Sequence, residues 1–361
     1  MHAVLWYKKL KIDIATRGLG GPNSIAFGAN GMGQAVDEAE TSALDPKGED
    51  FCGFKALGLP SSGTTCLPFL WQHGTMTALP TLGGHNGTAN QINIRGAVAG
   101  LAENSMPDPG CTAPQMLQFK PVVWENGKIH ELVTLDGDRD GVAFAINDNG
   151  QVAGASGQCS AFNPNLLVNL LPLHALLWEK GTVTDLGNLG GTGQGFGNYA
   201  LNLNNHGHVI GASDLPGDAN FHAFLWTKET GIHDLKTLTG DVNSAAVGIN
   251  DSGEIVGVSL DANFDPHPYL WQNGVMTGLN SLIPADSPLS LLLACSINSN
   301  GEIVGLAVTS TGELHGYLAI PSKAGAASGV SSPAMQGVTS PITLPDNAGR
   351  QFLRGLGIRG R

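Results

Sequence analysis

Short runs of alternating apolar and polar residues cover most of the chain, and runs of this length predict β-strands rather than helices. Residues 245–271 show the pattern most clearly, where A-A-V-G-I-N-D-S-G-E-I-V-G-V-S precedes H-P-Y-L-W after a short gap. Asn-Asp-Ser-Gly separates the first two apolar runs and predicts a tight hairpin turn, because glycine and asparagine tolerate a positive φ. A third strand ends at Trp271 and a fourth covers residues 275–279, so the stretch predicts four strands, named A to D here.

The four-strand pattern recurs along the chain with fixed anchor residues. One tryptophan ends strand C of each unit, at Trp6, Trp71, Trp124, Trp178, Trp226 and Trp271. One asparagine begins each A–B turn, at Asn30, Asn93, Asn147, Asn204, Asn250 and Asn298. We interpret the tryptophans as packing between units and the asparagines as turn residues whose amides bond backbone groups. Repeated small sheets that cannot bury their own faces are typical of a β-propeller.

The fold class predicted for residues 1–321 is therefore all-β, a β-propeller of four-stranded antiparallel blades. Six A–B hairpins, six D strands and seven C strands favour six blades, with seven as the alternative. Six blades close if a D strand near Ile12 completes the last one. One C strand is then in surplus, either residues 3–6 or residues 316–320.

Three linked motifs resemble those of the HAF repeat family, namely H-A-F-L-W at 222–226, D-L-G-N-L-G-G at 185–191 and G-I-N-D-S-G-E-I-V-G at 248–257. The resemblance covers residues 2 to about 320. The family is described as extracellular repeat proteins, mostly bacterial, so the resemblance implies export and a propeller-like fold but no established activity. The first copy, with A-N-G-M-G at 29–33, and the third, with Lys-Pro at 120–121, depart from the motifs and predict less regular blades.

Charge and the chain ends restrict the partners. A net charge of -12 disfavours nucleic acid and anionic membrane surfaces, and no apolar run is long enough to span a bilayer. No signal peptide precedes the first strand, and we expect an upstream end carrying an export signal to be missing. Residues 322–361 are rich in Gly, Ala, Ser and Pro and predict a flexible tail. Three arginines in its last eleven residues make that end a candidate docking tag.

Four of the five cysteines lie in insertions between strands B and C of the first three units. Cys52 and Cys66 share the first insertion, and Cys111 and Cys159 occupy equivalent loops of the next two units. We predict disulfides within each pair and hence an extracellular or cell-surface location. Zinc is the alternative, but no C-x-x-C motif or neighbouring histidine supports it. Cys295 is interpreted as a buried residue of strand A.

Two further patterns suggest ligands. Asp136, Asp138 and Asp140 match the first half of a calcium loop, and the alternative is a solvated acidic turn. No other cofactor is predicted. Histidines begin five of the C strands, and we interpret them as hydrogen-bonding residues at strand edges, at His2, His174, His222, His267 and His315.

The long B–C insertions suggest where function resides. The turn asparagine and the next C-strand end are 41, 31 and 31 residues apart in the first three units, against 21 or 22 in the others. Loops on a rigid scaffold commonly bind partners. We therefore predict a monomeric, secreted or cell-surface module that binds a glycan or protein partner through the insertion-bearing face.

The rival class is an enzyme. No serine-nucleophile elbow or phosphate-binding loop is present, and no catalytic residue is assigned. Propeller hydrolases take carboxylates from separate blades, so a glycoside hydrolase or polysaccharide lyase acting on extracellular polysaccharide remains the alternative. A structural surface component is the third hypothesis.

Overall fold

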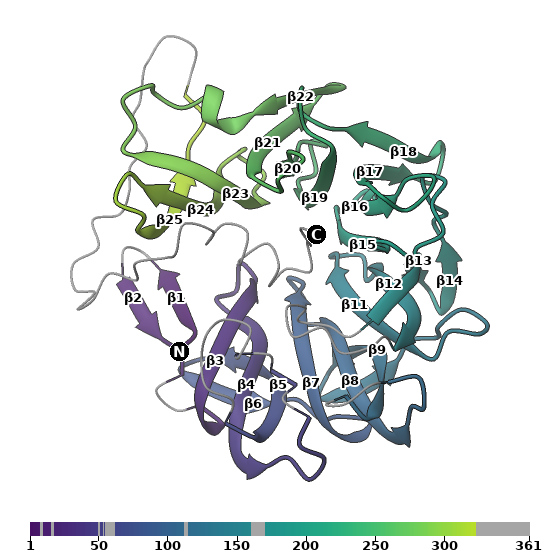
Figure 1. The fold of residues 1–361 in the computed structure, drawn as a ribbon. Coiled ribbons are helices and arrows are strands. Elements are labelled where there is room, and N and C mark those ends of the chain that lie inside the picture. The colour runs from purple at the N-terminus through teal and green to yellow at the C-terminus, as the bar shows by residue number, and fades with distance from the viewer. Residues whose placement is uncertain are drawn as a thin grey trace. The chain divides into compact units, whose positions relative to one another are not determined.

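The computed structural model describes residues 1–7, 10–15, 18–49, 51–52, 54, 62–111, 115–159 and 170–322 (Figure 1). The tail predicted over residues 322–361 therefore lies outside the described residues, apart from Ser322. Strands dominate, and 1% of the chain is helical, including the short 3-10 helix η2 (Leu279–Ser281). No helix in the described ranges is long and apolar enough to cross a bilayer.

Five sheets contain four antiparallel strands each, in sequence order across the sheet. They are blade 1, with β3 (Gly20–Ala29), β4 (Ala35–Leu44), β5 (Thr64–Gln72) and β6 (Thr75–Ala78); blade 2, with β7 (Gly83–Ile92), β8 (Val98–Pro107), β9 (Leu117–Glu125) and β10 (Lys128–Glu131); blade 3, with β11 (Asp140–Ile146), β12 (Val152–Cys159), β13 (Leu170–Glu179) and β14 (Thr182–Asp185); blade 4, with β15 (Asn198–Leu203), β16 (Val209–Asp214), β17 (Phe221–Thr227) and β18 (Gly231–Lys236); and blade 5, with β19 (Asn243–Ile249), β20 (Ile255–Leu260), β21 (Pro266–Gln272) and β22 (Val275–Gly278).

The sixth sheet, blade 6, contains β23 (Leu289–Ile297), β24 (Ile303–Thr309) and β25 (Leu314–Ala319). The predicted fold class, an all-β propeller of six antiparallel blades, is confirmed. Within the described residues, five blades carry all four strands and the sixth carries three.

The first C and D strands form a two-stranded sheet, β1 (Val4–Tyr7) with β2 (Leu10–Asp13). Ile12 pairs with Leu5 of β1, which differs from our expectation that the strand near Ile12 completes the last blade. The surplus C strand explains the difference, because pairing with an immediate neighbour in sequence closes only a short loop.

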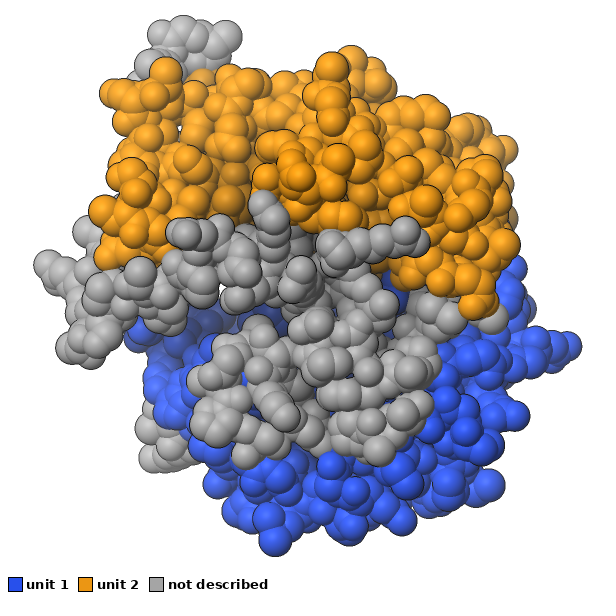
Figure 2. Space-filling model, in the orientation of Figure 1, with its two compact units in different colours: residues 1–187, 197–200, 355–357 blue, residues 188–196, 201–354, 358–361 orange. Residues whose placement is uncertain are grey.

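The chain divides into two compact units, coloured separately in Figure 2. Of the described residues, unit 1 contains those in the ranges 1–187 and 197–200, and unit 2 contains those in the ranges 188–196 and 201–322. Unit 1 contains the β1–β2 sheet and blades 1 to 3, and unit 2 contains blades 5 and 6 and most of blade 4.

The repeated tryptophans pack one blade against the blade before it. Trp124 of blade 2 packs with Val36 of blade 1, and its indole Nε1 donates to the Pro80 carbonyl at 2.8 Å. Trp178 of blade 3 packs against Val123 of blade 2, and its Nε1 donates to the Val133 carbonyl at 2.7 Å. The hydrophobic core of unit 1 therefore lies between its blades.

Trp6 departs from this arrangement. Its side chain is 53% exposed, whereas Trp124 is 2% exposed. Trp6 belongs to β1, whose sheet has only two strands, so fewer neighbouring side chains are available to cover the indole.

The glycine near the middle of strand B allows strands A and B to approach closely. A Cβ on Gly100 would lie 2.1 Å from the Thr88 carbonyl oxygen and 2.7 Å from the Trp124 ring. Gly154 is equivalent, with the Val142 carbonyl oxygen at 2.1 Å. The repeated glycine is therefore required by packing of the A–B hairpin beneath the tryptophan.

Candidate functional site

The turn asparagines stabilise the hairpins and connect neighbouring blades. The Oδ1 of Asn93 accepts the N–H groups of Arg95 and Ala97, at 3.0 and 2.9 Å. Its Nδ2 donates to the carbonyl of Asn147, the turn asparagine of the next blade, at 3.0 Å. In unit 2, Asn204 bonds Asn250 in the same way at 3.1 Å. These side chains have structural partners, which argues against a shared ligand site at the turns.

A second polar column, which the sequence analysis did not identify, lies at or near the start of several A strands. Asn86, Asp140 and Asn243 each accept a backbone N–H from strand C of the preceding blade, at 2.9 to 3.0 Å. Each stands seven residues before a turn asparagine, so that fixed spacing was the available signal. The column shows that the repeat places polar links as well as tryptophans between blades.

The B–C insertions of blades 1 and 2 carry the disulfides. Cys52 bonds Cys66 at the start of β5, with Cα atoms 5.4 Å apart. Cys111 of the second insertion bonds Cys159 at the end of β12, with Cα atoms 4.9 Å apart. Both predicted disulfides are confirmed. The third insertion, residues 160–169, lies outside the described residues.

Glu49 joins the first insertion to the second. Its buried carboxylate Oε1 accepts the N–H groups of Met116 and Leu117, at 2.6 and 2.9 Å. Asp45 of the same insertion accepts a hydrogen bond from the Asn86 amide at 2.9 Å. Both insertions are therefore held by buried polar contacts as well as by disulfides.

Glu103 lies beneath these insertions and is fully buried. Its Oε2 accepts the N–H groups of His85 and Asn86, at 3.1 and 3.0 Å, and its Oε1 accepts a hydrogen bond from Gln115 at 2.9 Å. Burial, followed by the negative charge of Glu49, raises the pKa of Glu103 to about 8. The carboxyl group is therefore mostly protonated at neutral pH.

Asp140 and Asp108 form a second carboxyl pair beside the Cys111–Cys159 disulfide. Burial, assisted by Asp108, raises the pKa of Asp140 to about 7. Burial also acts to raise the pKa of Asp108. Hydrogen bonds from the backbone N–H of Gly110 and from the side chains of Asp140 and Arg139 outweigh burial, so the pKa of Asp108 lies below its usual value. A proton on Asp140 can therefore be donated to a charged Asp108, whose buried Oδ2 has no other hydrogen-bond partner among the described residues.

The buried carboxyl groups predict that stability falls as pH rises. The folded protein retains protons on Glu103 and Asp140 up to about pH 8 and 7, whereas the unfolded chain loses them near pH 4. Below the pKa of the unfolded chain these two groups contribute their full stabilisation, which is on the order of a few kcal/mol. That stabilisation is lost as the pH rises through the pKa of the folded protein. The lowered pKa of Asp108 has the opposite effect on stability, because its contribution is lost as the pH falls. That loss occurs only below pH 3.8, the usual pKa of the group.

Thermal unfolding between pH 5 and 9 tests this prediction. The melting temperature should fall across the range, and Glu103→Gln should flatten that fall and make the variant more stable than the parent at pH 9. A variant whose pH dependence equals the parent's would show that Glu103 is charged throughout.

The calcium candidates occupy different environments. Asp136 is exposed, whereas Asp138 is buried and contacts Ser156 and, at 2.8 Å, the Nδ1 of His174. Asp140 accepts the N–H groups of Phe119 and Cys159, at 3.0 and 3.1 Å. The calcium site stays a prediction.

One group of three potential metal ligands has its donor atoms within 4.8 Å of one another in the described ranges, Glu38 with Cys52 and Cys66. The two sulfur atoms are already joined to each other. This group therefore offers no thiolate to a metal.

Three of the five histidines that begin C strands illustrate how these side chains bond nearby carboxylates. His222 pairs with Asp234 at 2.9 Å, and His267 pairs with Asp241 at 3.0 Å. His174 pairs with Asp138, as described above. Each of these three thus has its own partner, which agrees with the predicted edge hydrogen bonding. His315 differs, because its buried Nε2 lies 3.7 Å from Glu313 and has no hydrogen-bond partner among the described residues.

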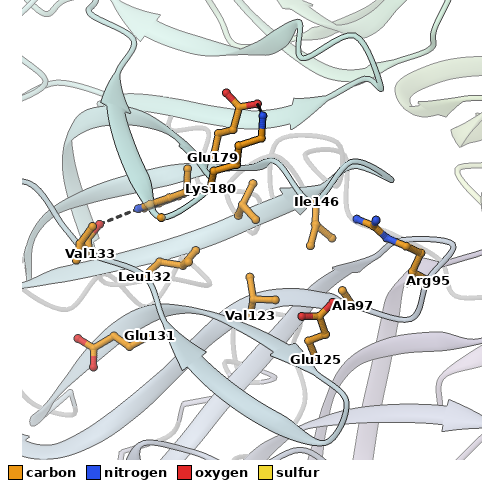
Figure 3. A pocket seen from close by; sticks show the side chains of 14 residues that line it. Arg95, Ala97, Val123, Glu125, Glu131, Leu132, Val133, Ile146, Glu179 and Lys180 are labelled. Atoms are coloured by element: carbon orange, nitrogen blue, oxygen red, sulfur yellow. Dashed lines mark hydrogen bonds and ion pairs between the residues drawn. The ribbon is translucent and has the colours of Figure 1, made fainter.

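A groove of about 220 Å³ lies between blades 2 and 3 within unit 1 (Figure 3). Val123, Leu132 and Ile146 line its middle, and Arg95 and Glu131 lie at opposite ends. Glu179 and Lys180, whose charged groups are 3.8 Å apart, lie along one side. The groove is the size of one large side chain and combines apolar walls with charges of both signs.

No protein-family model and no curated protein sequence matches this chain. Similar solved structures include an acylaminoacyl peptidase from Pyrococcus horikoshii, with 10% identity and a TM-score of 0.38 over 78% of this chain and 42% of that chain. A gluconolactonase from Xanthomonas campestris has 13% identity and a TM-score of 0.33, over 66% of this chain and 75% of that chain. A mutant of AofleA from Arthrobotrys oligospora has 11% identity and a TM-score of 0.37, over 77% of this chain and 80% of that chain. This chain thus spans less than half of the peptidase.

Proposed function

We propose that the protein is a secreted or cell-surface binding module, of the kind that its resemblance to HAF repeats implies, and that it engages a protein or glycan through the B–C insertions of blades 1 to 3. The two disulfides support an oxidising location. The binding surface itself is supported by the apolar residues that these insertions expose.

Three large apolar side chains at the insertion-bearing ends of blades 1 and 2 are exposed to solvent. Leu44 at the end of β4 is 76% exposed, Met106 in β8 is 59% exposed and Met116 in the second insertion is 44% exposed. Exposed methionine and leucine favour protein contact, because interfaces are enriched in methionine and bury apolar surface. This observation carries the proposal.

The described residues of the first two insertions are also held in place before any partner arrives. The backbone N–H of Met116 is bonded to Glu49, and Cys111 is joined to blade 3 through Cys159. A surface with fixed backbone loses less conformational entropy when it binds, so more of the contact energy appears as affinity. The arrangement suits recognition by a preformed surface.

Defined arrays test the binding function. The purified protein is applied to an oligosaccharide array and to a displayed peptide library, and bound material is recovered and analysed by mass spectrometry. We expect selective retention of unchanged ligands. Absence of selective binding in both formats would contradict the proposal.

The enzyme hypothesis has one observation in its favour, the raised pKa of a carboxyl group in each of two buried pairs. Glu103 and Asp140 are both fully buried, however, and neither lines the groove between blades 2 and 3. An enzyme predicts shortened oligosaccharides in the recovered material, and loss of that product in Glu103→Gln or Asp140→Asn. A binding module predicts no shortened product in any of these proteins.

A further inference from the structure

Two charged residues of the groove between blades 2 and 3, Arg95 and Glu125, have no Asp, Glu, Lys or Arg at the equivalent positions of blades 1, 4 and 5. Five of its 14 lining residues are charged, whereas 13% of the whole chain is charged. Glu125 and Arg95 illustrate the difference: the equivalents of Glu125 in blades 1, 4 and 5 are Gln72, Thr227 and Gln272, and those of Arg95 are Met32, His206 and Ser252. A feature needed only for packing would recur with the repeat, so these charges indicate a ligand.

Acidic groups predominate on the rim. Glu125, Glu131 and Glu179 face two basic residues, and Lys180 is already beside Glu179. Neither Glu125 nor Glu131 forms an ion pair with another described residue, and both are exposed. Apolar walls beneath unpaired carboxylates suit a segment that alternates apolar and basic side chains, because the long basic side chains lay their stems on apolar surface.

The C-terminal end of this chain has that composition. Residues 349–361 read G-R-Q-F-L-R-G-L-G-I-R-G-R, and they contain four of the seven arginines of the chain. Residues 323–361 together carry a net charge of +4, against -12 for the whole chain. Opposite charges on the tail and on the rest of the chain favour their association, most strongly at low ionic strength.

The linker between Ser322 and this C-terminal segment is also long enough for the segment to reach the groove. Gly349 lies 27 positions after Ser322. A chain of that length spans up to about 90 Å when extended, at roughly 3.3 Å per residue. A compact chain of the size of residues 1–322 is only about 50 Å across. The linker therefore does not prevent the segment from reaching the groove.

We infer that the groove between blades 2 and 3 is the docking site for residues 349–361 of the same chain. One large apolar side chain of the segment packs against Val123, Leu132 and Ile146 in the groove, and neighbouring arginines pair with Glu125 and Glu131. The site is separate from the exposed insertion surface described above, so its occupant and the partner of the insertions are independent.

Site-specific photocrosslinking of the full chain tests the assignment. Phe352 is replaced by the photoreactive amino acid benzoylphenylalanine, the protein is irradiated, and crosslinked peptides are sequenced by mass spectrometry. We expect intramolecular crosslinks to residues 123–133 or 178–181. Glu125→Gln combined with Glu131→Gln should lower their yield by about fivefold, since exposed ion pairs are individually weak and two are lost together.

Glu229→Gln is the matched control, because Glu229 is an exposed carboxylate at the C–D turn of blade 4 and lies outside the groove. The crosslinking yield of this variant should equal that of the parent. In both proteins the yield should decrease in high salt. Crosslinks to other parts of the chain, or none, would overturn the inference. Crosslinked dimers in place of intramolecular products would assign the groove to the tail of a second copy and would equally overturn it.

Discussion

Replacing Trp124 with alanine should lower the free energy of unfolding by about 3–5 kcal/mol, as expected for removal of a buried tryptophan. Its side chain is 2% exposed, packs with Val36 and Val98, and donates a hydrogen bond to Pro80. The variant loses apolar contact between two blades, and it leaves the Pro80 carbonyl without its hydrogen-bond donor. Trp226→Ala in unit 2 should cost a similar amount, since Trp226 is buried at the same repeat position.

Trp6→Ala is the matched control, because Trp6 ends the same strand of the repeat but is 53% exposed. We expect its effect on unfolding to be within about 1 kcal/mol, as for most changes at exposed positions. Chemical unfolding of the three variants, followed by tryptophan fluorescence and far-UV circular dichroism, gives the comparison. A Trp124 or Trp226 variant that stays as stable as the parent but loses ligand binding would mean that the column is a recognition surface.

Removing the Cys111–Cys159 disulfide should destabilise the protein by about 4 kcal/mol, and removing Cys52–Cys66 by about 3 kcal/mol, in the chain-entropy model. The order follows from the sequence separations of 48 and 14 residues, because the longer loop restricts the unfolded chain more. Paired cysteine-to-alanine variants, compared with the parent under non-reducing conditions, measure both values. Cys295→Ala controls for loss of a thiol that forms no disulfide.

Peptide mapping without reduction establishes the pairing before these variants are interpreted. We expect one crosslinked peptide for each pair and a free thiol at Cys295. Free thiols at all five positions after purification from an oxidising compartment would contradict the disulfides and weaken the proposed extracellular location.

Most of the fold could be predicted because the same residues recur at the same packing positions in several repeat units. The turn asparagine, the strand B glycine and the strand C tryptophan each have a local geometric cause, so their spacing in the sequence reports the sheet. The disulfides were predictable for a related reason, since Cys111 and Cys159 were expected in equivalent loops of adjacent units. Strand pairing at the chain ends was harder, because β1 and β25 are both C strands and sequence alone does not say which is surplus.

The polar groups beneath the insertions could not be predicted in the same way. Glu49 and Glu103 come from different blades, and their separation in sequence carries no signal that both accept hydrogen bonds from Asn86. The raised pKa of Glu103 depends on burial, which only the folded arrangement reveals. Arg95 and Glu125 differ from the repeat at their positions, and that departure was visible in the sequence but had no meaning until the groove placed them together.

The most direct test of the binding function compares three proteins for affinity toward a ligand selected from the arrays. The first is the parent, the second combines Leu44→Glu, Met106→Glu and Met116→Glu, and the third is Val275→Glu, an exposed apolar residue of blade 5. Charges placed in the proposed interface should weaken binding at least about tenfold, a loss of 1.4 kcal/mol, without lowering the melting temperature. Val275→Glu should bind as the parent does. Unchanged affinity in the triple variant would contradict the central claim that the insertion-bearing face of blades 1 and 2 engages the partner.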